Sequence, residues 1–88
     1  MENLINLATI TLNYNQISDI SPLKNLTSLT DPSLCGNQIS DISPLVENDG
    51  LGEGDIVYLG DNRLDLSEGS EDMKNIRTLE ERGVKVYY

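Results

Sequence analysis

The 88-residue sequence contains no tryptophan, no phenylalanine and no histidine, and its aromatic side chains are four tyrosines. Any hydrophobic core must therefore be built mainly from aliphatic side chains. The sequence also has no serine elbow, no glycine-rich phosphate loop with a lysine, and no pair of cysteines at metal-binding spacing. Its single cysteine, Cys35, has no histidine to activate it and fits a small strand residue better than a nucleophile. We therefore expect no enzymatic activity, no catalytic residues, no bound metal and no cofactor.

Basic residues are scarce, with six lysines and arginines against fifteen aspartates and glutamates and a formal net charge of -9. Nucleic acids and anionic membrane surfaces both require a basic patch, so neither is expected as a partner. Basic partners or metal ions suit this charge better.

Long apolar runs are missing too. No run approaches the roughly 20 residues of a membrane helix, and the first three residues lack the positive charge that starts a signal peptide. The chain is expected to be soluble as written, and its length allows one domain. A longer parent protein could be secreted or held at a cell surface, so the compartment stays open.

What the sequence does contain is an internal repeat. The nine residues from Asn15 to Leu23 read NQISDISPL, and the same nine residues recur from Asn37 to Leu45, 22 positions later. A third unit follows, displaced by three extra residues in an acidic, glycine-rich stretch over residues 47–55. The matching positions of the third unit are Leu51, Val57, Leu59, Asn62 and Leu64. A fixed period of this length predicts a repeat fold in which each unit forms one coil.

Each unit is expected to supply one short strand, because its apolar residues alternate with polar or small ones. Pro32 takes an apolar strand position in the second unit and cannot donate a ladder hydrogen bond, which predicts a bulge or a one-sided gap. The asparagines after the strands are expected to satisfy the backbone of a tight turn through their side-chain amides. Ser21 and Ser43, each followed by proline, are predicted N-caps of short helical turns on the other side of the coil.

The pattern LxxLxLxxNxI resembles the bacterial leucine-rich repeat family, most closely the internalin type with its recurring ISDISPL. The resemblance implies an α/β leucine-rich repeat solenoid, a short right-handed superhelix with a parallel sheet on its concave side. It is specific for the fold and weak for function, because such repeats serve many partners.

The C-terminal segment is predicted to be a cap. Met73, Ile76 and Leu79 recur at helical spacing, with Ser67 or Ser70 as N-cap, and Gly83 is placed to end the helix. Residues 84–88 read as a last strand with both valines pointing inward. We therefore divide the chain into about three repeats over residues 1–66 and a helix-strand cap over residues 67–88.

The first repeat has no such cover in this sequence. Leu4, Leu7, Ile10 and Leu12 are predicted to form an exposed edge, and such edges promote association. The chain is then either a C-terminal fragment of a longer repeat array or a protein that self-associates, with a homodimer through this edge as the expected form.

The outward-facing strand residues form the predicted recognition surface, since a solenoid presents one row of side chains per repeat. These residues are Thr9, Thr11, Asn13, Asp31, Ser33, Cys35, Ile56, Tyr58, Gly60, Lys85 and Tyr87. The expected binding residues among them are Tyr58, Tyr87, Lys85, Asp31, Thr11, Asn13 and Ser33. Tyrosines offer large area with a polar tip, although a mere cross-strand tyrosine pair explains the first two equally well.

The sequence thus favours a protein-protein interaction scaffold that uses its concave sheet. The alternative is a purely structural end-cap or oligomerisation unit with no ligand of its own. The stretch GLGEGD at residues 50–55 superficially resembles a calcium loop, but its ligand spacing is poor and a solvated turn is favoured.

Overall fold

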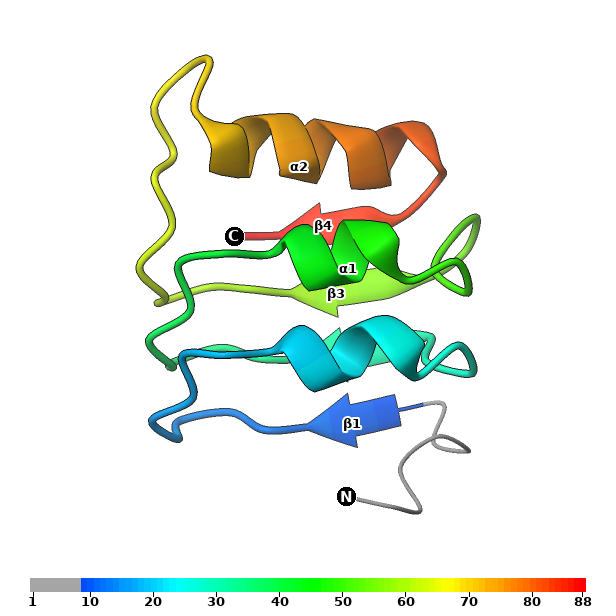
Figure 1. Cartoon of the computed structure of the whole chain (residues 1–88), viewed down its shortest axis with the longest axis horizontal. Helices are drawn as coiled ribbons and strands as arrows, with labels where there is room; N and C mark the ends of the chain where they lie inside the picture. Colours follow the sequence, from blue (N-terminus) through cyan, green and yellow to red (C-terminus); the bar gives the residue numbers. More distant parts are fainter. Residues whose placement is uncertain (1–8) are drawn as a thin grey trace.

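The computed structural model describes residues 9–88. They form one parallel sheet, and helices cover one of its two faces (Figure 1). The four strands have the order β1-β2-β3-β4, so strands that follow one another in the sequence are also neighbours in the sheet. The strands are β1 (Thr9–Thr11), β2 (Asp31–Ser33), β3 (Ile56–Tyr58) and β4 (Lys85–Tyr87). The helices are the 3-10 helix η2 (Ser21–Asn25), α1 (Ser43–Glu47) and α2 (Glu71–Glu81).

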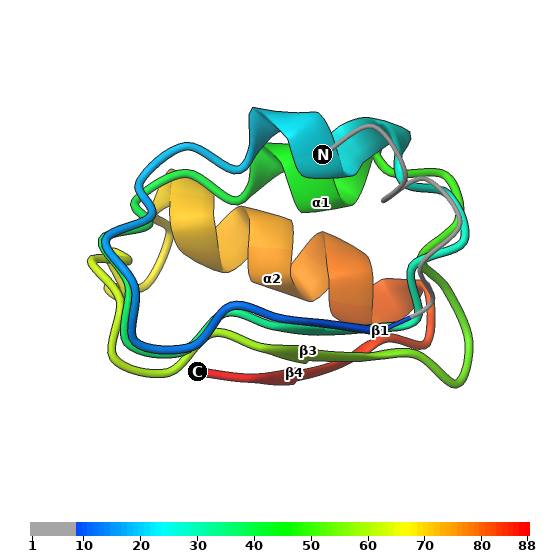
Figure 2. The ribbon, with the colours of Figure 1, turned by 90° about the horizontal axis from the view of Figure 1, so that it is seen from below.

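Successive strands repeat at the spacing that the sequence predicts. Thr9 pairs with Asp31, 22 residues on, and Ser33 pairs with Tyr58 after the longer second unit. We call residues 9–30 coil 1, residues 31–55 coil 2 and residues 56–66 coil 3. Viewed along the stack in Figure 2, the coils superimpose, with the sheet on one side and η2 and α1 on the other. The predicted solenoid with a parallel sheet is confirmed.

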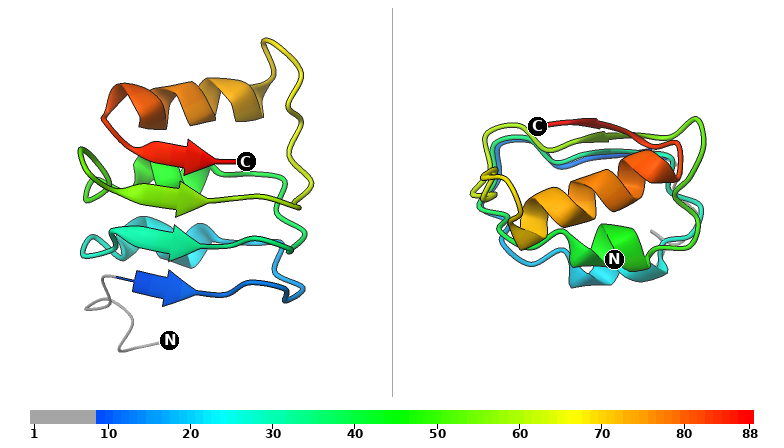
Figure 3. Two further views of the ribbon diagram at one scale, coloured as in Figure 1. Left: turned by 180° about the vertical axis from the view of Figure 1, so that it is seen from behind. Right: turned by 90° about the horizontal axis from the view of Figure 1, so that it is seen from above.

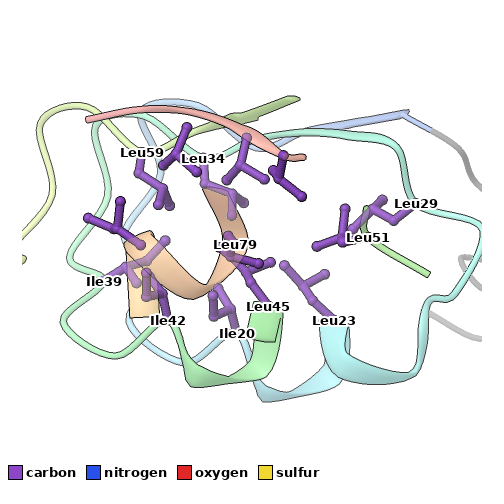
Figure 4. Packing of buried hydrophobic residues seen from close by; sticks show 14 of the residues in the cluster. Ile20, Leu23, Leu29, Leu34, Ile39, Ile42, Leu45, Leu51, Leu59 and Leu79 are labelled. Carbon is purple, nitrogen blue, oxygen red and sulfur yellow. The ribbon is translucent and has the colours of Figure 1, made fainter. Parts of the chain in front are cut away.

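The core lies between the sheet and the helices and is aliphatic (Figure 4). Each strand buries its middle residue, as the alternation predicts, and the helical turns and ascending segments supply the rest. The buried core residues are Ile10, Ile20, Leu23, Leu26, Leu29, Leu34, Ile39, Ile42, Leu45, Leu51, Val57, Leu59, Ile76, Leu79, Val84 and Val86. Because every coil contributes to one continuous interior, no coil can bury its own apolar side chains alone.

Pro32 leaves a gap on one side of β2. Its ring is buried in the core, and β2 keeps a register of three residue pairs with β1 but of one pair, Ser33 with Tyr58, with β3. The hydrogen bonds to β3 resume at Leu34, whose N-H donates to the Tyr58 oxygen at 2.9 Å. The predicted one-sided gap is therefore present, while the pairing of β2 with β1 continues without a bulge.

The buried Asn37 and the half-buried Asn62 join the coils at the carboxyl ends of the strands. The Asn37 amide nitrogen donates to the Leu12 oxygen of coil 1 at 2.9 Å and also to two oxygens of its own coil. Its side-chain oxygen accepts from two backbone N-H groups of coil 1. Asn62 repeats the arrangement between coils 2 and 3, donating to the Leu34 oxygen at 2.8 Å. These contacts confirm the predicted role of the asparagines.

The helical turns on the opposite side are capped differently from the prediction. The N-cap positions of η2 and α1 are Ile20 and Ile42, and neither Ser21 nor Ser43 provides a side-chain cap. Instead, each serine N-H donates at 2.9 Å to the carboxylate of the aspartate two residues earlier. The serine caps were wrong because aspartate, which recurs in phase with serine, is the stronger acceptor for these N-H groups.

Helix α2 covers the end of the stack beyond coil 3. Seen from above in Figure 3, it crosses the space between the sheet and α1, where it buries Ile76 and Leu79. Ser70 is its N-cap and accepts from the Met73 N-H at 3.1 Å. Gly83, with φ of 93°, ends the helix in the left-handed region that glycine favours and turns the chain into β4.

The longer second unit is held by a buried asparagine that the repeat pattern does not reveal. The Asn48 amide nitrogen donates to the Leu23 and Leu26 oxygens at 2.8 and 3.1 Å, which satisfies carbonyls at the end of η2. The next turn lies so close to coil 1 that a methyl group on Gly50 would sit 1.9 Å from the Thr27 oxygen. The extra residues are therefore packed against the neighbouring coil.

Candidate functional site

The outer face of the sheet brings together side chains that are far apart in the sequence. We use the name sheet face for the outward residues of β1 to β4. The strand pairing places Thr11 beside Ser33, Ser33 beside Tyr58, and Tyr58 beside Tyr87 in one row. The second row contains Thr9 and Asp31 at one end and Ile56 and Lys85 at the other. Each of the four strands thus contributes one residue to each row.

Tyr58 and Tyr87 form the largest feature of the sheet face. Their ring centroids lie 5.2 Å apart and their planes differ by 10°, so the rings stack across the β3-β4 pair. The side chains are nonetheless 37% and 49% exposed. Stacking limits the rotation of both rings, so a partner that contacts them would freeze little further motion.

The sheet face carries little charge compared with the rest of the molecule. Among the outward strand residues, Asp31 and Lys85 are charged and of opposite sign, whereas the chain as a whole contains fifteen acidic residues. The other acidic residues of the described part of the chain lie in turns, loops and helices. A surface with exposed tyrosines and few charges can be dehydrated at lower cost than the acidic surfaces around it.

Two of the predicted binding residues also hold the sheet together. The Asn13 side-chain oxygen accepts from the Ser33 hydroxyl at 3.0 Å and from the Cys35 N-H at 2.8 Å. Both side chains are half-buried, while Thr11 and Lys85 are exposed. We conclude that Asn13 and Ser33 fix the carboxyl end of β2 against coil 1. The exposed residues Thr9, Thr11 and Lys85 and the half-buried Asp31 are the other polar residues of the face beside the tyrosines.

The predicted association edge is described in part. Leu4 and Leu7 lie outside the described residues, Ile10 is buried in the core, and Leu12 is half-buried. Leu12 borders an apolar groove in coil 1. The groove is lined by Leu12, Ile17, Asp19, Ile20, Pro22 and Leu23.

The acidic, glycine-rich stretch forms a turn of its own. The Asp55 carboxylate accepts from the Gly52 N-H at 2.8 Å, and the Asp55 N-H donates to the Gly52 oxygen at 3.1 Å. Within residues 9–88, no three side chains of His, Cys, Asp or Glu are placed to hold a metal ion. Over the same residues, none of the helices has the length and apolar character to cross a membrane.

Sequence reasoning missed Tyr14 and Asp72. Tyr14 is 76% exposed and follows β1 with a left-handed backbone. The neighbouring residues in the sequence do not predict this conformation. Asp72 is buried in the first turn of α2, where its carboxylate accepts from the Asp65 N-H at 2.8 Å and ties the cap to coil 3. Several acidic residues, Glu68 and Glu71 among them, lie close to Asp72 in the sequence, so the sequence does not distinguish it from a surface acid.

The described fold is that of a leucine-rich repeat solenoid, with one strand and one helical turn per coil and a helix over the last coil. In agreement, residues 5–47 match the family described as Leucine Rich repeats (2 copies). No curated protein matches the chain. Leucine-rich repeat domains generally mediate protein-protein interaction, and the matched segment covers coil 1 and the first part of coil 2.

Proposed function

We propose that this protein is a non-enzymatic binding module whose sheet face contacts a protein partner. The observation that carries the proposal is the stacked, exposed pair of Tyr58 and Tyr87 on a sheet face whose charged residues are Asp31 and Lys85. Tyrosine is enriched in protein interfaces and among the residues that contribute most to binding, so an exposed pair on a face with few charges supports an interface there.

The two rows of outward residues on the sheet face support this assignment. Tyrosine contributes large contact area with two side-chain torsions, and the stacked geometry already fixes those torsions. Lys85 lies two residues before Tyr87 on the same face of β4, and Asp31 lies two strands away. The two opposite charges flanking the tyrosine row would orient a partner that carries complementary charges, since charges at an interface set specificity more than affinity.

The proposal is tested by a double variant, Tyr58→Ser with Tyr87→Ser, in the full chain. A binding partner captured on the immobilised protein is purified, and its affinity is measured by calorimetry for the wild type and for each variant. We expect the double variant to bind at least 30-fold more weakly, roughly 2 kcal/mol, because hot-spot aromatics contribute about that much.

The matched control is Leu66→Ser, which removes another exposed apolar side chain, 49% exposed, from outside the sheet face. It should leave the affinity unchanged. If Leu66→Ser weakens binding as much as the double variant, or if the double variant binds normally, the sheet face is not the recognition surface.

A second candidate function is a structural unit that associates through coil 1. The apolar groove beside Leu12 and Ile17 and the position of β1 at one edge of the described sheet favour it, because such edges pair with other strands. This reading includes both a self-associating short protein and the end of a longer repeat array.

Sedimentation equilibrium separates the two candidate functions. If coil 1 mediates self-association, the wild type sediments as a dimer and Ile17→Glu, which places a charge in the groove, sediments as a monomer. A wild-type monomer would exclude the homodimer and leave the sheet face as the main candidate surface.

A further inference from the structure

Tyr14 occupies a backbone conformation that tyrosine rarely adopts. Its φ is 57°, in the left-handed region, and its side chain is 76% exposed, more than any other large apolar or aromatic side chain of residues 9–88. Such a conformation costs free energy for a residue with a Cβ atom and is typically retained where it serves a purpose. The surrounding backbone holds Tyr14 there, since its N-H donates to the Cys35 oxygen at 2.8 Å.

The fold requires the left-handed conformation at this corner but does not require tyrosine. The equivalent corners of coils 2 and 3 are also left-handed and hold Gly36, with φ of 72°, and Asp61, with φ of 57°. Glycine and aspartate are residues that tolerate this conformation. Neither of them presents an aromatic ring, so the tyrosine in coil 1 needs a separate explanation.

The ring is held in place by the coil beneath it. A methyl group on Gly36 would lie 2.4 Å from Cδ1 and 2.7 Å from Cε1 of Tyr14, so the ring occupies the space that a side chain at Gly36 would need. One side of the ring thus rests on the backbone of coil 2, and the remainder faces solvent. The result is a fixed aromatic surface at the rim of the sheet face, next to Asn13.

We propose that this ring is a stacking site for an arginine side chain of the protein partner, an inference that rests on the proposed binding function. A guanidinium group stacks on a tyrosine ring and loses little hydration when it does so. The net charge of -9 favours partners with basic segments and draws them toward the surface at long range.

Charges on the molecule do not oppose a cation at this corner. Lys85 lies three strands away, roughly 14 Å at the usual strand spacing, which exceeds the screening length of about 8 Å at physiological salt. Asp61 and Arg63, which carry opposite charges, lie at the corner of coil 3, about 10 Å away by the same spacing. The ring of Tyr14 is therefore free to attract a guanidinium group in its own right.

The test uses the full chain and a capped pentapeptide, Gly-Arg-Gly-Arg-Gly, followed by NMR. Binding of an arginine to the Tyr14 ring is expected to shift the arginine methylene resonances upfield and to give nuclear Overhauser contacts to the Tyr14 ring protons. Tyr14→Phe should preserve both signals because the ring suffices. Tyr14→Gly should abolish the contacts and weaken binding roughly 2-fold to 5-fold, and glycine is well suited to this backbone conformation.

Two controls make the outcome unambiguous. A peptide with citrulline, the uncharged analogue of arginine, should lose the upfield shifts, and Tyr58→Ser with Tyr87→Ser should retain the Tyr14 contacts. Unchanged binding by Tyr14→Gly, or equal binding of the citrulline peptide, would overturn the arginine site. Neither result bears on Tyr58 and Tyr87, whose role is decided separately by the affinity of the double variant for the protein partner.

Discussion

At the scale of the residue, a single buried asparagine connects two coils through directional hydrogen bonds, which apolar contacts do not provide. Asn37 is 6% exposed and makes five hydrogen bonds with its side chain, three as donor and two as acceptor. Replacing it by alanine would leave backbone groups of two coils without partners in the interior. We expect Asn37→Ala to lower the free energy of unfolding by roughly 2–4 kcal/mol, because each unpaired buried group costs about 1–3 kcal/mol.

Chemical denaturation measures this effect, and Asn15→Ala is the matched control. Asn15 holds the same position in coil 1, but its side chain is exposed and, among the described residues, donates to the Leu12 and Asn13 oxygens of its own coil. Its removal should cost about 1 kcal/mol or less. Equal losses for the two variants would mean that the asparagines act within their turns and do not join the coils.

A second residue-scale prediction concerns Gly50. Its backbone is not in the left-handed region, and glycine is needed there because Thr27 lies too close for a Cβ atom. Gly50→Ala should destabilise the chain by roughly 2 kcal/mol or more through overpacking. Gly54→Ala provides the comparison, since Gly54 has φ of 89° and nothing within 4 Å, and should cost about 1 kcal/mol of backbone strain. Thermal unfolding that ranks Gly54→Ala as the more harmful variant would contradict the packing of residues 47–55 against coil 1.

Structural roles could be assigned from the sequence to residues that recur in each coil, but not to residues that occur once. Asn37 and Asn62 could be assigned from the repeat, because the same side chain appears at the same place in each coil. Asn48 and Asp72 could not, since each makes a unique contact that no second copy signals. For the sheet face, strand alternation predicted the outward position of Tyr58 and Tyr87, but it could not show that Asn13 and Ser33 bond to each other.

At the scale of the element, aspartate carboxylates accept hydrogen bonds from the serine N-H groups of short turns. The Ser67 hydroxyl and N-H both donate to the Asp65 carboxylate, and together they lower the pKa of that carboxyl below its ordinary value of 3.8. The Ser21 donors lower the pKa of Asp19 in the same way. In each turn the charged form of aspartate is the one that the folded chain stabilises.

Stability should therefore depend on these turns in acid. A carboxyl whose folded pKa is lowered contributes stability that is complete above its unfolded pKa and is lost as the pH falls through the folded pKa. We expect the Tm of the wild type to fall below about pH 4, and the Tm of Asp65→Asn to fall less over that range. Ser67→Ala, which removes the hydroxyl donor, should have an intermediate slope. Identical slopes for wild type and Asp65→Asn would show that the turn contributes nothing to the acid sensitivity.

Elements differed in how well their boundaries could be predicted. Helix α2 was predictable because Met73, Ile76 and Leu79 mark one face and Ser70 and Gly83 mark its ends. The strands were predictable in position and direction, but the effect of Pro32 was open, because only the three-dimensional register shows which neighbour its missing N-H would have met. The N-H that Pro32 lacks would have pointed toward β3, so the pairing of β2 with β1 is unaffected.

At the scale of the whole molecule, coils 1 and 3 differ in their surroundings within residues 9–88. Helix α2 covers coil 3, whereas coil 1 holds an apolar groove and β1, an edge strand of the described sheet. The acidic side chains lie mostly on turns and helices, which leaves the sheet face with two opposite charges and a tyrosine pair. This division between an acidic body and a nearly uncharged face is the reason for assigning partner binding to the sheet.

The central claim is that residues 9–88 wind into coils whose strands lie side by side in parallel, because the interior, the asparagine contacts and the sheet face all depend on it. Scalar couplings across hydrogen bonds, measured by NMR on the full chain, test it directly. We expect couplings from the Leu12 N-H to Ser33, from the Leu34 N-H to Tyr58 and from the Leu59 N-H to Tyr87. Absence of these couplings, or couplings that join the strands in antiparallel order, would contradict the structure and the function proposed from it.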